Sequence, residues 1–251
     1  MFAMMRWVTS VLLAATGLAL IVASASLDAD NPLRRRLSAE RTEASTVSRF
    51  ERTDGGGGFV LDRSGSSIMF LDDDGDEVLV LEPRRLPGGG NSLVTDWGEE
   101  ILRISVVGGV TLYVEDAPWG VIADSWEPAR PLRPDRLGIE EVIALAEETA
   151  VTLREWLGRP VQVDYGATPR DGLGVVAEAL ELIATGISDA KSEDDAALNG
   201  LQRVRIVSSG GPDATFDGET LEIRIDPLAG HAGRPSSGLI RQALLNVGDQ
   251  S

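Results

Sequence analysis

The chain has no cysteine, one histidine and one lysine. Without cysteine it has no disulfide framework, no thiol nucleophile and no site for lipid attachment. Its one histidine, His231, excludes metal sites that need two imidazoles, and the G-x-S-x-G serine elbow of a histidine-assisted triad is also missing. We therefore expect no catalytic residue, no metal ligand and no cofactor-binding residue, and we interpret His231 as an ordinary loop residue.

Positive charge is scarce as well. The sequence holds 23 lysine and arginine residues against 40 aspartate and glutamate residues, which gives a formal net charge of -17. Such a surface repels phosphate backbones, so no nucleic-acid partner is expected. For the one basic triplet, Arg34–Arg36, contact with anionic lipid headgroups is the alternative to simple solvation.

The N-terminus carries the longest uncharged run. This run covers residues 7–22, follows Arg6 and leads into Ala23 and Ala25. Its apolar core is short for a membrane span, which needs about 20 apolar residues, and the Ala-x-Ala pattern is typical of cleavage after Ala25. We interpret residues 1–25 as a signal peptide and expect a periplasmic or secreted protein. The alternative is an uncleaved anchor, the only membrane attachment expected.

Two composition changes divide the rest of the N-terminal half. Residues 26–54 are polar and mixed in charge, with few apolar side chains to bury, and are predicted to be a linker. Over residues 55–127, short apolar runs alternate with turn signals, which predicts an antiparallel β region. The expected strands are Phe59–Arg63, Ile68–Leu71, Val78–Glu82, Ile101–Val107 and Val110–Glu115.

The last two of these strands form the clearest predicted hairpin. Leu102, Ile104 and Val106 alternate with polar residues and should therefore share one buried face. Gly108 and Gly109 are predicted to be a two-residue turn.

Closely spaced prolines after residue 127 mark a boundary, because proline cannot donate a backbone hydrogen bond. Residues 135–248 then alternate between helical and strand patterns, which predicts an α/β region. The expected elements are helix Ile139–Leu157, strand Val161–Tyr165, helix Leu173–Ile187, strand Val204–Ser208, a hairpin at Asp217–Gly218 and helix Ser236–Val247. The expected fold class is α+β: an N-terminal antiparallel β meander or small open barrel, followed by an α/β region with three helices and a short sheet.

Ser188 and Lys191 match the S-x-x-K pattern in which lysine activates serine. The accompanying S-D-N and K-T-G elements are missing, and the pair lies in a polar stretch predicted to follow a helix. We interpret this match as chance.

Gly172, Gly174 and Ala177 spell G-x-G-x-x-A, a dinucleotide-binding pattern. In such sites the glycine turn follows its strand directly, whereas here residues 166–171 intervene. We therefore interpret Asp171 as the N-cap of a helix and expect no dinucleotide.

Acidic residues and tryptophans offer two further candidate sites. The Asp72–Glu77 segment could share a calcium ion, but its spacing is not that of an EF-hand, and a solvated turn is the preferred interpretation. Calcium binding stays open. Trp97, Trp119 and Trp126 are expected in or near loops, where packing in a core or between regions is preferred over stacking on sugars or a partner.

Three segments carry a resemblance to a known family. They are Phe59–Ser64, Gly108–Tyr113 and Gly233–Ser237. Together they resemble an uncharacterised domain-of-unknown-function family of alphaproteobacterial, Caulobacter-type proteins. The resemblance implies the length and organisation of the chain, but no activity and no site residue.

The element order of the α/β region is similar to that of the N-terminal half of zinc metalloproteases. Their last helix carries H-E-x-x-H, whereas residues 236–242 here contain no zinc ligand, so peptidase activity is not expected. The favoured hypothesis is an exported, non-enzymatic envelope protein that binds a protein or a glycan through loops or a cleft. The alternative is a glycosidase-like hydrolase that uses two carboxylates.

Overall fold

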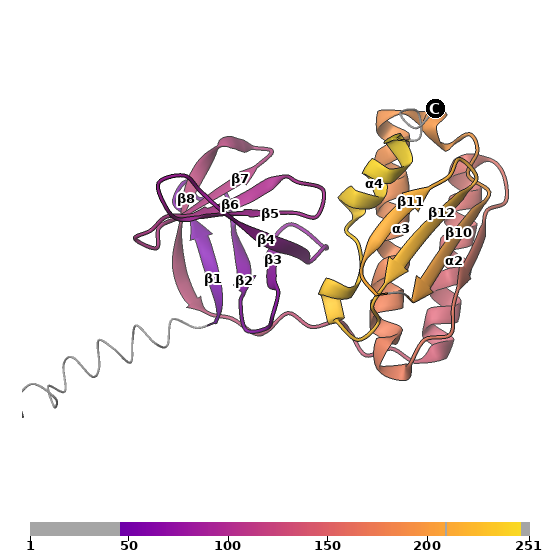
Figure 1. The fold of residues 1–251 in the computed structure, drawn as a ribbon, viewed down its shortest axis with the longest axis horizontal. Helices are drawn as coiled ribbons and strands as arrows, with labels where there is room; N and C mark the ends of the chain where they lie inside the picture. The colour runs from indigo at the N-terminus through magenta and orange to yellow at the C-terminus, as the bar shows by residue number, and fades with distance from the viewer. Residues whose placement is uncertain (1–45, 209, 247–251) are drawn as a thin grey trace, which may run out of the picture. The chain divides into compact units, whose positions relative to one another are not determined.

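A computed structural model describes residues 46–208 and 210–246, in which a β-barrel precedes an α/β region (Figure 1). Ser45–Ser251 cluster as one compact unit. Each barrel strand pairs antiparallel with the next, and β8 pairs with β1, which closes the barrel. The strands are β1 (Val47–Arg52), β2 (Gly58–Asp62), β3 (Ile68–Asp72), β4 (Leu79–Arg85), β5 (Asn91–Val94), β6 (Glu100–Ile104), β7 (Val110–Val114) and β8 (Ala117–Pro128).

The predicted meander is confirmed, but the open barrel is wrong, because part of the predicted linker is a strand. Val47–Arg52 form β1, which joins β2 to β8. Val47 and Phe50 are buried in β1, while charged side chains between and after them are partnered at the surface; Arg49, for example, forms an ion pair with Asp73. Two apolar residues among charges gave too weak a pattern to predict this strand. The predicted limits of the signal peptide, of the β region and of the α/β region stay predictions.

The predicted turn at Gly108–Gly109 is also wrong. β6 ends at Ile104, and the loop over residues 105–109 closes through hydrogen bonds from Ser105 N–H to the Gly109 carbonyl and from Gly108 N–H to the Ser105 carbonyl. Val106 is therefore in the loop and is 73% exposed instead of buried. The longer loop lets Gly108 adopt a positive φ of 88°, a conformation that glycine tolerates.

Side chains fill the barrel interior. Phe59 stacks on Phe50 with ring centroids 5.1 Å apart, and Phe70 contacts Phe59 at the same centroid distance. Aliphatic side chains of the other strands surround this aromatic column. They include Leu61, Leu81, Leu93, Leu102, Val110 and Leu112.

Asp62 fastens the barrel to the segment that follows it. Its buried carboxylate accepts hydrogen bonds from the N–H groups of Ser64 and Leu132, each 2.8 Å long. Burial alone would raise the pKa of Asp62, but these hydrogen bonds outweigh it and hold the pKa below its ordinary value. The ionised carboxylate of Asp62 therefore binds the segment that connects the barrel to the first helix, through the N–H of Leu132.

The α/β region has the predicted order of three helices and a short sheet. Its four-stranded sheet has the order β11-β12-β10-β9, in which only β11 is antiparallel to its neighbour. The elements are α2 (Ile139–Leu157), β9 (Gln162–Tyr165), α3 (Leu173–Glu193), β10 (Arg203–Ser208), β11 (Asp213–Phe216), β12 (Thr220–Ile225) and α4 (Ser237–Leu245). Within the described part of the chain, no helix is both long and apolar enough to cross a membrane.

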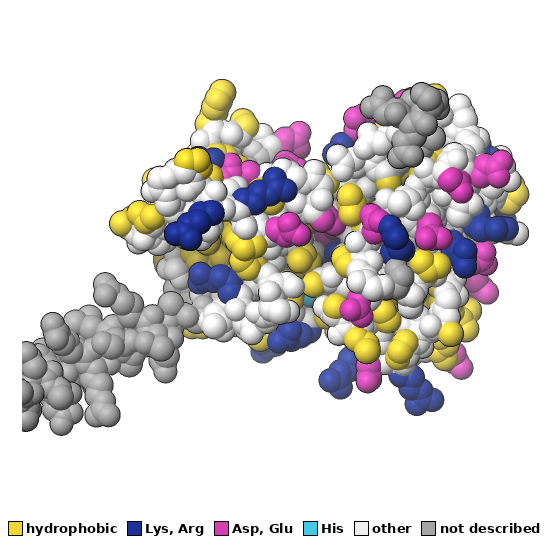
Figure 2. Space-filling view, in the orientation of Figure 1, with side chains coloured by type: hydrophobic (Ala, Val, Ile, Leu, Met, Phe, Trp, Pro, Cys, Tyr) yellow, Lys and Arg dark blue, Asp and Glu magenta, His cyan; other side chains and the backbone are white. Residues whose placement is uncertain are grey.

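One face of this sheet is apolar and the other is charged. Val204, Ile206 and Ile223 are buried in one core with the helices. The residues that alternate with these buried positions point to the other face of the sheet. Several of them are charged and pair across the strands; Arg205, for example, lies 3.9 Å from Glu222. Acidic and basic side chains are accordingly interspersed over this region in Figure 2.

Replacing Phe50 by alanine tests the closed barrel. We expect the free energy of unfolding to fall by about 3–5 kcal/mol, because a large buried ring is removed and leaves a cavity. Urea denaturation followed by circular dichroism measures this loss. The Val107→Ala control removes a side chain that is 90% exposed and should change stability by less than about 0.5 kcal/mol. Equal small effects of both changes would contradict burial of β1 in the barrel.

Candidate functional site

A cavity of about 230 Å³ lies among the β3–β4 loop, the segment after the barrel, α3 and the turn before α4. The turn is a short 3-10 helix, Gly230–Gly233. Most of the polar side chains around the cavity are ionisable. They are Asp76, Glu77, Arg133, Asp135, Glu178, Glu181, His231 and Arg234.

His231 is the most unusual of these residues. It is 4% exposed, and its Nδ1 lies 2.9 Å from Oε2 of Glu178. Its other ring nitrogen, Nε2, is buried and has no hydrogen-bond partner among the described residues. A buried polar atom without a partner is uncommon and marks a place where a further group could bind.

Arg234 binds residues from separate segments that line the cavity. The guanidinium is buried; its Nε donates to Glu178 at 2.9 Å, and a terminal nitrogen donates to the carbonyl of Val78 at 3.0 Å. A second terminal nitrogen lies 3.8 Å from Glu77. Arg234 therefore joins α3, the loop before β4 and the segment before α4.

The first residues of α4 are bound by two carboxylates of barrel loops. Ser237 donates to Glu77 through its N–H at 3.1 Å and its hydroxyl at 2.5 Å. Ser236 donates to Asp96 in the same two ways, at 3.0 and 2.5 Å, and its hydroxyl also caps α4 by accepting from Leu239 N–H. Carboxylates are favoured at the N-terminus of a helix, where backbone N–H groups lack partners.

The carboxylates of the cavity differ in their affinity for protons. Burial raises the pKa of Glu77, and the hydrogen bonds from Ser237 and the charge of Arg234 offset only part of this effect. Burial acts on Glu178 too, but the hydrogen bond from His231 and the charge of Arg234 outweigh it and lower its pKa. Burial, followed by the charges of Glu178 and Asp135, raises the pKa of Glu181.

The backbone around His231 is folded tightly. The loop closes through a 2.7 Å hydrogen bond from Asp226 N–H to the carbonyl of Gly233. A Cβ atom at Gly233 would lie 1.9 Å from the carbonyl oxygen of Asp226, so only glycine fits there. This close approach sets the positions of His231 and Arg234 on either side of Gly233.

His231 lies in a short 3-10 turn between β12 and α4, as expected for a loop residue, but it is buried and paired with Glu178, which the sequence did not indicate. Its partner Glu178 lies 53 residues earlier, in the middle of α3, and no local motif connects the two. The available signals were weak: the chain has one histidine, and it stands just before the Gly233–Ser237 segment that carried the family resemblance.

The acidic segment Asp72–Glu77 does not act as one cluster. Asp72 accepts from Asp74 N–H, Asp73 pairs with Arg49, and Glu77 binds Ser237. In residues 46–208 and 210–246, no three histidine, aspartate or glutamate side chains are grouped so that they could hold a metal ion.

The S-x-x-K match has no catalytic geometry. Ser188 and Lys191 lie inside α3, which continues to Glu193, and not after a helix as expected. The Lys191 ammonium donates to the carbonyl of Trp156 at 2.6 Å and pairs with Asp195 at 3.1 Å.

The glycines of the dinucleotide pattern serve close packing. A Cβ atom at Gly172 would lie 2.3 Å from Pro227, and one at Gly174 would lie 2.1 Å from the carbonyl oxygen of Asp135. The predicted N-cap at Asp171 is wrong, because Gly172 occupies the N-cap position and a short 3-10 turn precedes α3.

The three tryptophans divide between the two alternatives. Trp97 is partly buried and packs on Gly238, where a Cβ atom would lie 2.6 Å from the indole ring. Trp119 and Trp126 are 94% and 68% exposed on β8, so the preferred interpretation as packed residues is wrong for both.

The predictions for residues 1–25 and Arg34–Arg36 lie outside the described residues.

Comparison with known proteins found one family. Residues 32–244 match the family described as "Domain of unknown function (DUF4908)". This is consistent with the resemblance to a domain of unknown function, and it covers both the barrel and the α/β region. No curated protein and no solved structure matched the chain.

Replacing Glu77 by glutamine tests the buried carboxylate. Because the folded-state pKa of Glu77 is raised, the unfolded chain releases this proton first as pH rises. Wild-type stability should therefore fall relative to the Glu77→Gln variant between the unfolded and the folded pKa. Urea denaturation at several pH values from 3 to 8 measures the difference in stability between the two proteins. This range begins about one unit below the ordinary glutamate pKa. Glu82→Gln, a matched change at an exposed glutamate, is the control for the substitution itself. A difference between the wild type and Glu77→Gln that does not vary with pH would refute the raised pKa.

Proposed function

The chain belongs to the DUF4908 family, a domain family of unknown function. We propose that it is an exported, non-enzymatic binding protein. Its ligand is a small organic cation, such as a primary amine, held in the acidic cavity around His231. The ligand part of the proposal follows from side chains of the cavity, and the export part from the N-terminal sequence.

The observation that carries the proposal is the buried Nε2 of His231, which has no hydrogen-bond partner in the part of the chain that the structure describes. Glu178 has a lowered pKa, so its carboxylate accepts hydrogen bonds, and Nδ1 of His231 must carry the proton between them. We propose that the ring itself carries no further proton, so that Nε2 presents a lone pair. A buried lone pair is stabilised by an N–H donor, and an ammonium group supplies one.

The charge around the cavity favours the same ligand. Five carboxylates line the cavity against two guanidinium groups, those of Arg133 and Arg234. Among the described residues, no hydrogen bond or ion pair to the Glu181 carboxylate is found, and its raised pKa reflects burial and acidic neighbours. A bound cation would offset this excess of negative charge.

The size of the cavity limits the ligand. Drug-sized ligands occupy pockets of roughly 300–1,000 Å³, whereas this cavity measures about 230 Å³. An alkyl amine or diamine with a few carbon atoms fits this volume, and a folded peptide does not.

The environment of the carboxylates also bears on the hydrolase alternative. A glycosidase needs two carboxyl groups that are free to act on either side of the scissile bond. Both oxygens of Glu77 accept from Ser237, and Glu178 is held by His231 and Arg234. These two acids serve the structure of the site, which supports binding over hydrolysis.

Two further features fit an envelope protein. The Ala-x-Ala pattern before Ser26 supports export through a cleaved signal peptide. The exposed rings of Trp119 and Trp126 support contact with an envelope protein or a glycan, since tryptophan stacks well on both.

Export has a direct test in the bacterial host. N-terminal sequencing of the protein recovered from the periplasm should begin at Ser26, because the expected cleavage follows Ala25. Protein found in the membrane fraction with residues 1–25 intact would instead support the uncleaved anchor.

Calorimetric titration with 1,4-diaminobutane tests the ligand class. We expect binding at low ionic strength by the wild-type protein, and none of 1,4-butanediol or succinate, which are of similar length but neutral or anionic. Glu181→Gln removes a carboxylate, and His231→Asn keeps a donor for Glu178 but removes the Nε2 acceptor. Each should weaken binding at least about tenfold, or about 1.4 kcal/mol.

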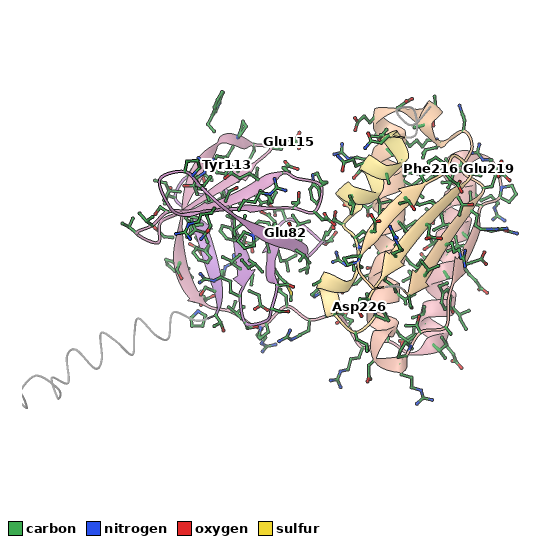
Figure 3. All side chains as sticks on the ribbon, in the orientation of Figure 1. Glu82, Tyr113, Glu115, Phe216, Glu219 and Asp226 are labelled. Atoms are coloured by element: carbon green, nitrogen blue, oxygen red, sulfur yellow. The ribbon has the colours of Figure 1, made fainter. Side chains whose placement is uncertain are left out.

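The matched control is Glu115→Gln, at an exposed glutamate outside the cavity (Figure 3). It should bind the diamine as the wild type does. Binding of succinate in preference to the diamine, or equal binding by all variants, would refute the site. Turnover of a glycoside by the purified protein would replace the proposal by the hydrolase alternative.

A further inference from the structure

The second sheet ends in an open edge. Among the described residues, β11 is the outermost strand and pairs only with β12. An edge strand presents backbone N–H and C=O groups that another extended chain can pair with. Proteins usually protect such an edge with charge, proline or a covering element.

The hydrogen-bond register identifies the outward groups of β11. In an antiparallel pair, residues that bond the partner strand alternate with residues that point away from it. Asp217 N–H donates to the carbonyl of Thr220, so Thr215 and Asp213 take the same orientation toward β12. Ala214 and Phe216 therefore direct their backbone groups to the outer edge. In agreement, Ala214 N–H points away from β12 and donates to the side-chain carboxylate of Asp213 at 2.9 Å, a bond that an incoming strand must replace.

A groove runs beside this edge. A cavity of about 720 Å³ is lined by both outward residues of β11, with α4 on its other side. Figure 3 labels Phe216 near the end of β11 in this part of the molecule. Leu239 and Ala243 give the α4 side apolar contacts, and Gln242 and Asn246 add amide groups. Apolar and amide groups together suit an extended peptide, which offers side chains and backbone at once.

The charge at one end of the groove is negative. The turn after β11 carries Asp217 and Glu219, and in the ranges that the structure describes neither has an ion-pair partner. Backbone N–H groups of Thr220 and Glu219 lower the pKa of Asp217 and keep it ionised. A basic segment would complement this end.

We propose that β11 accepts an extended, basic polypeptide segment of a partner protein as a fifth strand of the four-stranded sheet. The segment pairs with Ala214 and Phe216 and lies in the groove against α4. This site shares no residue with the cavity around His231, so the proposal is tested independently of the proposed amine ligand.

Fluorescence anisotropy with a labelled octapeptide of alternating lysine and valine tests this site. We expect saturable binding to the wild-type protein. A peptide with glutamate in place of lysine should bind at least tenfold more weakly, because its charge matches that of the turn. A peptide with proline in place of valine should not bind, because it lacks the N–H groups that strand pairing needs.

The matched variants differ at one position. Ala214→Pro removes an outward N–H without breaking the ladder to β12, because proline is tolerated on the free side of an edge strand. It should weaken binding of the lysine–valine peptide at least tenfold. Ala214→Ser keeps the N–H and should bind as the wild type does. Equal binding by both variants would overturn the proposal.

Amide hydrogen exchange of the wild-type protein supplies a measurement that needs no variant. The peptide should slow exchange of the Ala214 and Phe216 amides and leave those of β9 unchanged. The proposal is overturned if exchange is unaffected at saturating peptide, or if no peptide binds. It is also overturned if sedimentation shows a dimer whose β11 amides are protected without peptide, because a second copy would then occupy the edge.

Discussion

The buried guanidinium of Arg234 is the constraint on which the candidate site depends. A buried charge needs partners, since an unpaired one costs several kcal/mol or more. Its partners come from segments far apart in the sequence: Glu178 from α3, and the Val78 carbonyl and Glu77 from the loop before β4. Satisfying one side chain therefore brings together three of the four segments that line the cavity.

The chain has no disulfide to reinforce this arrangement, and helix capping takes part of that role. Two consecutive serines at the start of α4 bind two carboxylates from separate barrel loops. Each carboxylate satisfies a backbone N–H that the helix leaves free, so the contact stabilises the helix and the attachment together. The indole of Trp97 on Gly238 adds apolar contact beside these hydrogen bonds.

Periodic patterns in the sequence predicted most of the fold. α2 has the expected limits because apolar residues recur at helical spacing and Gly158, with a positive φ of 67°, ends it. β1 was missed because only two of its residues are apolar and the others are a serine and three charged residues. β5 is four residues long and follows a glycine-rich turn, so it offered too few alternating positions to detect.

The candidate site was much less predictable than the fold. Its residues come from four separate segments, and a contact such as that of His231 with Glu178 depends on tertiary packing. Sequence reasoning could find the scarcity of histidine, but not the burial of this one. The partners of the acidic segment were equally out of reach, because Asp73 and Glu77, four residues apart, bind different side chains.

Two carboxyl groups that line the cavity make the folded chain less stable when they are ionised. The raised pKa values of Glu77 and Glu181 mean that the fold disfavours their ionised forms relative to the unfolded chain. An apolar residue of similar volume is often neutral or stabilising in place of a buried charge. Sequences that specify a fold follow local rules almost everywhere and break them where function requires it. The carboxylates break these rules in one small volume, together with the Nε2 of His231, which has no partner among the described residues; this is the basis for proposing a ligand there.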